Sequence, residues 1–201
     1  MRRQVRLQQL GGARAMILHR PHANVQALTR QLQAIGLAVE QAWPELGALA
    51  LAADFIFFDA DMGYDAQFPW AAGEAPMPMI VLIGSEAPGR IEWSLQIGAH
   101  AQLLKPITGS GVYSAVLMAR DAFDRQRALA AEIADLRRRL DERQTVVRAV
   151  MLLASLGKTE AEAYAQLRQM AMAWSISFED AALRVVARHG TEGRDDQRSR
   201  G

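Results

Sequence analysis

Short apolar runs alternate with segments of helical period over roughly the first half of the chain. The central runs are apolar on both faces, which is typical of parallel strands covered by helices on each side. The alternation predicts a doubly wound, flavodoxin-like α/β domain with a five-stranded parallel sheet over residues 13–110. The expected strands are residues 13–18, 38–41, 55–59, 79–83 and 102–104, and the expected helices are 25–35, 46–52 and 90–97.

One long helix is expected after this domain, because no proline or glycine occurs from Val112 to Leu153. Four apolar residues within it follow a four-three-four spacing that predicts a short dimerising coiled coil over residues 111–147. Arg143 interrupts the pattern, so parallel and antiparallel pairing both stay open. Packing of the same face on the chain's own domain is the alternative. The seam residues are Leu129, Ile133, Leu136 and Leu140.

The last part of the chain reads as two further helices. Thr159 and Glu162 have the spacing of a capping box, and Ser177 with Asp180 offers a second helix start. Together with the end of the long helix they predict a three-helix unit over residues 148–189. The polar ends of the chain are expected to be a flexible arm, residues 1–12, and a disordered tail, residues 190–201.

Composition excludes several classes of site. Among 201 residues there is no cysteine, so disulfides and cysteine-based metal or nucleophile sites are ruled out. The four histidines are not spaced to form a metal site or a catalytic triad, so we expect no cofactor, no metal and no enzyme activity. We expect a cytoplasmic protein with no membrane partner, since no apolar run is long enough to span a bilayer. The net charge of +1 neither favours nor excludes nucleic-acid binding.

Polar residues stand at the carboxyl ends of the predicted strands, where doubly wound sheets carry their functional groups. Asp59 ends the third strand, Lys105 and Pro106 end the fifth, and Ser85 follows the fourth. This arrangement resembles a response-regulator receiver domain. The resemblance implies that Asp59 is the phosphoacceptor, that Lys105 holds the phosphoryl group before a cis-favouring proline, and that Ser85, or the adjacent Gly84, is the switch residue.

The chain departs from receivers at the end of the first strand. Receivers carry an acidic pair there to hold Mg²⁺ for phosphoryl transfer, whereas this chain has His19 and Arg20, and Asp61 is the only extra carboxylate nearby in sequence. We therefore hypothesise a pseudo-receiver in which Arg20 or Lys105 neutralises Asp59 without chemistry. Retained phosphorylation of Asp59 and a purely local salt bridge or cap are the alternatives.

Small and apolar residues recur at fixed spacing over the C-terminal helices, with an Ala-Tyr pair and a following Leu-Arg. They are Val147, Arg148, Ala149, Leu152, Leu153, Thr159 to Tyr164, Leu167, Arg168, Ala171, Met172, Ala181, Val185 and Val186. This set resembles an ANTAR domain. With the receiver-like domain and the coiled coil, this is similar to the AmiR/NasT family of transcription antiterminators, and the Ile35-Gly36 turn and the 41–44 loop lean towards the aliphatic-amidase regulator branch. The resemblance covers residues 13–188.

The resemblance implies a homodimer that binds paired hairpins in a leader RNA. It also implies a ligand-sensing negative regulator, similar to periplasmic binding proteins, as partner. Val150 stands where the family usually has a lysine, which removes one phosphate contact. The alternatives are a regulator gated by phosphorylation and a dimeric scaffold without RNA binding. The RNA-binding candidates are Arg148, Lys158, Arg168 and Tyr164, of which Tyr164 is expected in the core rather than stacking on a base.

Overall fold

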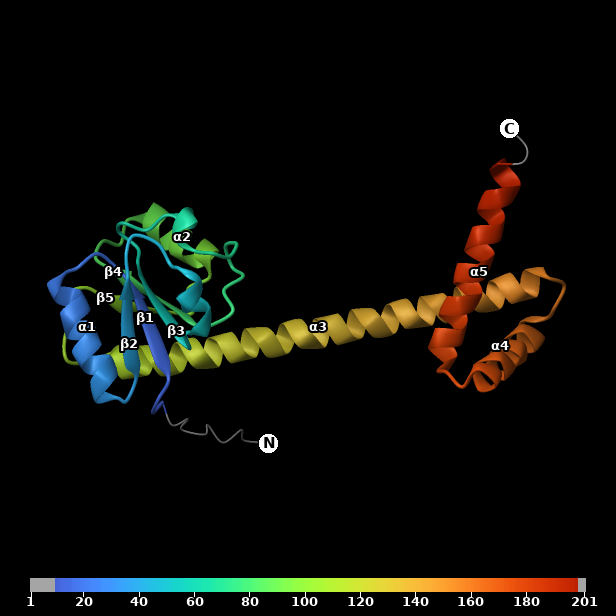
Figure 1. The fold of residues 1–201 in the computed structure, drawn as a ribbon, viewed down its shortest axis with the longest axis horizontal. Coiled ribbons are helices and arrows are strands. Elements are labelled where there is room, and N and C mark those ends of the chain that lie inside the picture. Colours follow the sequence, from blue (N-terminus) through green and yellow to red (C-terminus); the bar gives the residue numbers. More distant parts are fainter. Residues whose placement is uncertain (1–9, 199–201) are drawn as a thin grey trace. The chain divides into compact units, whose positions relative to one another are not determined.

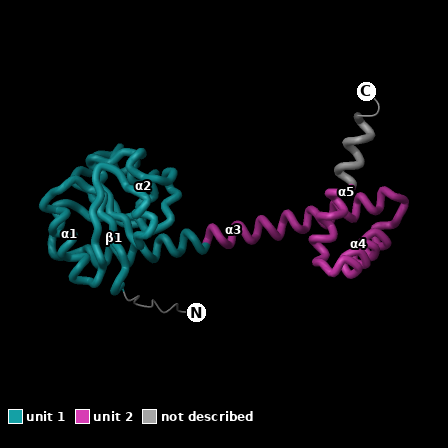
Figure 2. The backbone as a smooth tube through the Cα atoms, viewed as in Figure 1, with its two compact units in different colours: residues 1–128 teal, residues 129–201 magenta. Residues whose placement is uncertain are grey.

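The computed structural model describes residues 10–198, and the side chains up to Arg188. It divides into two compact units, residues 1–128 and 129–201 (Figure 2). The long helix α3 (Val112–Ser155) begins in the first unit and ends in the second, where α4 (Glu160–Trp174) and α5 (Phe178–Arg198) follow it. The elements before α3 are β1 (Arg14–Leu18), α1 (Ala23–Ala34), β2 (Ala38–Ala42), the 3₁₀ helix η1 (Ala48–Ala52), β3 (Phe55–Asp59), the 3₁₀ helix η2 (Asp65–Gln67), β4 (Met79–Ile83), α2 (Pro88–Ile97) and β5 (Ala101–Leu104).

The five strands form one sheet in the order β2-β1-β3-β4-β5 (Figure 1), and every neighbouring pair is parallel. This is the doubly wound, flavodoxin-like topology that the apolar runs predict. The register pairs Leu18 with Phe58 and Asp59 with Leu82, so β1, β3 and β4 end close to the same edge of the sheet. Residues that follow these strands are therefore brought together although they lie far apart in sequence.

Two apolar layers hold the sheet, one on each face. Helix α1 and the first turns of α3 cover one face, where Leu28, Phe57 and Val116 are fully buried. The other face packs against η1, α2 and the loop after β3, with Phe58 and Ile97 in its core. All five residues of β3 and of β4 are buried, which explains why these two strands have no polar alternation in the sequence.

Two local expectations for the first unit differ from the structure. Residues 46–52 were expected to be helical, but only a five-residue 3₁₀ helix, η1, forms after Gly47. The predicted arm of residues 1–12 is packed from Leu10 onwards, because Leu10 is buried and Gly12 N donates to Gly36 O at 3.0 Å. Residues 1–9 lie outside the described part of the chain.

Helix α3 begins as part of the first unit. Val112, Ala115, Val116 and Ala119 are buried against the sheet. Phe123 is buried as well and packs edge-on against His100, which lies just before β5. The predicted coiled-coil segment of residues 111–147 therefore includes about three turns that cover the sheet. Periodicity alone misplaces this boundary, because a sheet-facing stripe and a coiled-coil seam have nearly the same spacing.

The second unit has a small core of its own, made by the end of α3 with α4 and α5. Ala149, Leu153, Leu167 and Ala181 are buried in it, as a three-helix unit requires. Thr159 forms the predicted capping box with Glu162, and Ser177 Oγ accepts from Asp180 N at 3.0 Å.

The predicted disordered tail overlaps a helix in the structure. Helix α5 continues to Arg198, whereas a tail was expected from residue 190. The prediction relied on the polar and charged composition of residues 190–201, which does not by itself prevent a helix from continuing. Residues 199–201 lie outside the described part of the chain.

Candidate functional site

Asp59 lies at the carboxyl end of β3 and is almost fully buried, with 3% of the residue exposed. Lys105, which follows β5, places its Nζ 2.6 Å from Asp59 Oδ1. The two residues meet because both strands end at this edge of the sheet, with β4 between them. Lys105 therefore contacts Asp59 directly, as one of the two hypotheses drawn from the sequence supposes.

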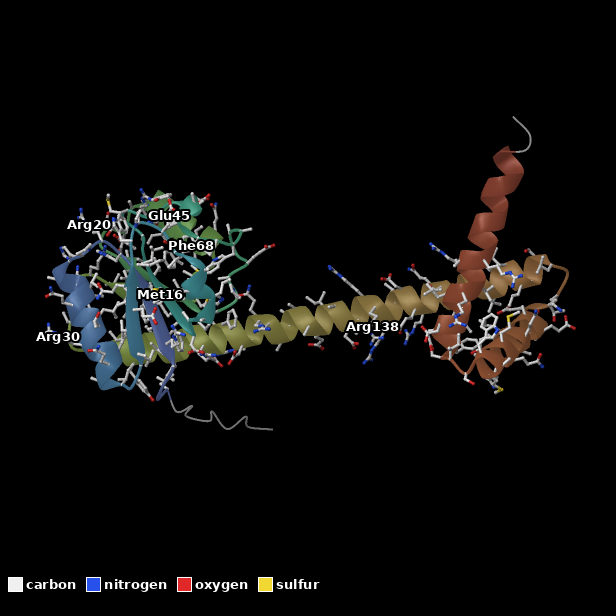
Figure 3. The ribbon with its side chains drawn as sticks, viewed as in Figure 1. Met16, Arg20, Arg30, Glu45, Phe68 and Arg138 are labelled. Carbon is white, nitrogen blue, oxygen red and sulfur yellow. The ribbon has the colours of Figure 1, made fainter. Side chains whose placement is uncertain are left out.

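His19 places an imidazole nitrogen next to Asp59, at a position where receivers have a carboxylate. Its Nδ1 lies 2.6 Å from the backbone oxygen of Arg20 and must carry the hydrogen, since a carbonyl oxygen can only accept. Its Nε2 lies 3.3 Å from Asp59 Oδ2, too poorly aligned to count as a hydrogen bond. The side chain of Arg20 is exposed (Figure 3), so it does not neutralise Asp59 as the alternative option supposed.

Asp61 completes the cluster from the loop after β3. Its carboxylate accepts from Gly84 N and from Ser85 N, each at 3.0 Å, and Lys105 Nζ lies 2.6 Å from its Oδ2. Partial burial raises the pKa of Asp61, but the hydrogen bonds from Lys105, Ser85 and Gly84 outweigh burial and hold the pKa below its ordinary value. Ser85, predicted as a switch residue, takes part through its backbone nitrogen.

The cluster does not fit the Mg²⁺ that receivers use. Mg²⁺ needs several oxygen ligands in octahedral geometry, but Lys105 Nζ stands between the two carboxylates and His19 presents a nitrogen. Within residues 10–188, no group of three or more acidic, histidine or cysteine side chains is arranged to hold a metal ion.

The loop after β3 is also tied to α2 by two hydrogen bonds that no sequence pattern predicts. Arg90 donates to Gly63 O at 2.9 Å, and Trp93 Nε1 donates to Asp65 Oδ1 at 2.6 Å. A side chain at Gly63 would collide with Trp93, because a Cβ there would lie 2.2 Å from its ring. Residues 61–65 are therefore held at both ends, by the β4 terminus and by α2.

In the second unit, Tyr164 and Arg168 lie on the exposed face of α4. Tyr164 is 44% exposed, so the expectation that it belongs to the core is wrong. One side of its ring packs on Phe178 at 4.9 Å between centroids, and the Arg168 guanidinium lies 5.8 Å from the ring centroid. Beside them is an open hollow of about 340 Å³ lined by Ala161, Tyr164, Ala165, Arg168, Gln169 and Met172.

The other RNA-binding candidates are distributed around the unit. Arg148 and Lys158 are exposed, and among the described residues neither has an aromatic neighbour like that of Arg168. Val150 is 8% exposed and belongs to the core, so this position contributes to packing rather than to a phosphate-facing surface. Trp174 with Arg184 stacked at 5.6 Å forms a second exposed aromatic–arginine pair that the sequence patterns did not single out.

The predicted coiled-coil seam is an uncovered apolar stripe on α3. Its four members are between 41% and 58% exposed. Among the described residues of the second unit, none covers this face enough to bury it. The stripe consists of Leu129, Ile133, Leu136 and Leu140.

Comparison with known families agrees with the two-unit structure. A family model described as "AmiR, N-terminal" matches residues 13–120, which is more than half of the chain. The chain belongs to the AmiR N-terminal family. A second model, the ANTAR domain, matches residues 134–186. The AmiR-like domain thus includes the start of α3, and the ANTAR domain contains the three-helix core.

Curated relatives of this AmiR-type ANTAR protein are transcriptional regulators. The chain is 31% identical over 143 residues to the transcriptional regulatory protein PdtaR of Mycobacterium tuberculosis, found in two strains, with 69% of each chain covered. A response regulator of Thermotoga maritima is 20% identical with a TM-score of 0.45, covering 55% of this chain and 98% of the other. The chemotaxis regulator CheY4 of Vibrio cholerae is 21% identical with a TM-score of 0.42, covering 54% and 98%. No helix among the described residues is both long and apolar enough to cross a membrane.

Proposed function

We propose that this AmiR-type ANTAR protein is a dimeric, RNA-binding antitermination regulator that acts in the cytoplasm on hairpins of a nascent leader RNA. The observation that carries the proposal is the exposed pair of Tyr164 and Arg168 beside a hollow on the ANTAR domain. Sequence-specific RNA recognition relies on unstacked bases that pack on aromatic rings and arginine planes. An exposed ring backed by Phe178 and flanked by a guanidinium offers that chemistry.

Dimerisation would place two such surfaces on one molecule. The uncovered stripe on α3 has the heptad spacing of a coiled coil. Exposure of its four large apolar side chains to water is unfavourable, and pairing with a second copy would bury them. Each ANTAR domain is small, so one hairpin gives a limited contact. Two tethered domains gain affinity from the raised effective concentration of the second.

Control by a protein partner fits the receiver-like pocket better than control by phosphorylation. Lys105 already pairs with both carboxylates, and the metal ligands that phosphoryl transfer needs are replaced by His19 and Arg20. Through its family resemblance we propose a ligand-sensing negative regulator, similar to periplasmic binding proteins, as that partner.

The test is binding of the full-length protein to a two-hairpin leader RNA taken from beside its own gene, at two salt concentrations. We expect specific binding that weakens steeply with salt, and at least a tenfold loss in Arg168→Ala. The matched control is Arg30→Ala, which removes the same charge from the exposed face of α1 (Figure 3) and should leave binding unchanged. A dimeric protein that does not bind this RNA would instead favour the scaffold.

A further inference from the structure

Three hydrogen-bond donors converge on the Asp61 carboxylate from outside its own loop. Gly84 N and Ser85 N stand at the end of β4 and reach different oxygens of the carboxylate, each at 3.0 Å. Lys105 Nζ, at the end of β5, lies 2.6 Å from Oδ2. Two backbone N–H groups and an ammonium together form the kind of donor set that binds an anion.

Gly84 is the residue that makes this approach possible. A Cβ at position 84 would lie 2.4 Å from Asp61 Oδ2 and 3.1 Å from Lys105 Cε. The first distance is shorter than any real contact of this kind, so a side chain there would push the carboxylate away from the donors. Lys105 is held too, since its side chain is only 12% exposed and also contacts Asp59. We call these three donors, Gly84 N, Ser85 N and Lys105 Nζ, the cradle. The cradle is therefore already formed around an anionic group.

We propose that Gly84, Ser85 and Lys105 form an anion site for which the Asp61 carboxylate is the built-in occupant. The site is filled from within, so a small oxyanion from solution has no donors left to bind. The donors that hold Asp61 also keep its pKa low, which keeps this occupant charged at neutral pH.

The Asp61 carboxylate also links the anion site to helix α2. Asp61 fixes the start of the loop to the β4 terminus, and Arg90 and Trp93 fix residues 63–65 to α2. The position of α2 is thereby coupled to the filled anion site through one short segment. This coupling needs no added ligand and does not depend on RNA binding by the ANTAR domain.

Removing the occupant should open the site to a soluble oxyanion. The probe is inorganic phosphate, titrated against chloride of matched ionic strength while the melting temperature of the full-length protein is measured. We expect a saturable rise of several degrees in Asp61→Ala beyond the small rise of the wild type. The double variant Asp59→Asn/Asp61→Ala should bind phosphate more tightly, because Asp59 no longer repels it.

Glu86→Ala is the matched control, since it removes an exposed carboxylate beside the cradle but not within it. It should respond to phosphate as the wild type does. A folded Asp61→Ala protein whose phosphate response equals that of the wild type and of Glu86→Ala would overturn the proposal. Equal saturable binding by the wild type would overturn it as well, because the site would then not be filled.

A second measurement needs no substitution. Amide hydrogen exchange in the wild-type chain should show the Gly84 and Ser85 amides protected at least tenfold more than the neighbouring Glu86 amide. Added phosphate should leave this protection unchanged. Equally fast exchange of the three amides would mean that the carboxylate does not occupy the cradle, and would refute the proposal even if Asp61→Ala fails to fold.

Discussion

Lys105 Nζ lies 2.6 Å from Asp59 Oδ1 in a site where Asp59 is 3% exposed. The ammonium also contacts Asp61, so one cation compensates two carboxylates. A buried carboxylate without a partner is costly, because the charge has lost its water. The pocket of this AmiR-type domain therefore depends on Lys105 for the charge balance that a metal ion would otherwise provide.

Lys105→Met should destabilise the first unit by about 3–5 kcal/mol, because it keeps the apolar stem but leaves Asp59 buried without its cation. Urea-induced unfolding followed by tryptophan fluorescence measures this loss. Lys158→Met is the control, since Lys158 is exposed and its replacement should change the free energy of unfolding by less than about 0.5 kcal/mol. Equal effects of the two substitutions would show that the buried pair contributes no stability.

The exposed stripe on α3 gives a prediction for assembly. Ile133→Glu/Leu136→Glu should convert a dimer into a monomer, because two like charges would then face each other across the seam. Sedimentation equilibrium measures the change. Ala131→Glu is the matched control, since residue 131 lies on the opposite side of the helix and is exposed. A double variant that remains dimeric would place the dimer contact elsewhere on the chain.

The capping box of α4 predicts a local loss of stability. Thr159 Oγ1 accepts from Glu162 N, and Glu162 Oε2 accepts from Thr159 N, so Thr159→Ala removes one side-chain cap. We expect a cost of about 1 kcal/mol to the ANTAR domain, measured by amide hydrogen exchange within α4. Thr145→Ala is the control, because Thr145 donates to Asp141 O inside a helix and its hydroxyl is not a cap. Similar losses in both variants would contradict a specific role for the cap.

Much of the fold was predictable because its elements depend on local pattern. The buried strands β3 and β4 are continuous apolar runs, and Thr159 with Glu162 marks the start of α4 by spacing alone. The meeting of Asp59 and Lys105 also followed from sequence, since parallel strands end at one edge of a sheet. These inferences need only the order of the elements.

The parts that sequence patterns did not predict depend on the path of loops and on residues at the boundary between core and surface. His19 points inward and Arg20 outward although they are adjacent, which strand periodicity does not decide once the strand has ended. The cradle for Asp61 joins two loops whose path no pattern specifies. Tyr164 follows the buried Ala163 on α4, at the border of the buried face, where a large ring can be partly packed and still half exposed.

The lowered pKa of Asp61 predicts how acid acts on the first unit. A carboxyl whose pKa is lower in the folded state binds protons less readily there than in the unfolded chain. Its contribution to stability is therefore complete above the pKa of the unfolded chain, about 3.9 for an aspartate, and is lost as the pH falls through the folded-state pKa.

The measurement is the free energy of unfolding of the wild type and of Asp61→Asn between about pH 7 and pH 3. We expect the wild type to be more stable at neutral pH, because its carboxylate accepts from Gly84, Ser85 and Lys105. The difference should stay constant down to about pH 5 and then shrink as Asp61 takes up its proton. A difference that is unchanged at pH 3 would mean that the carboxylate charge is not what stabilises the cradle.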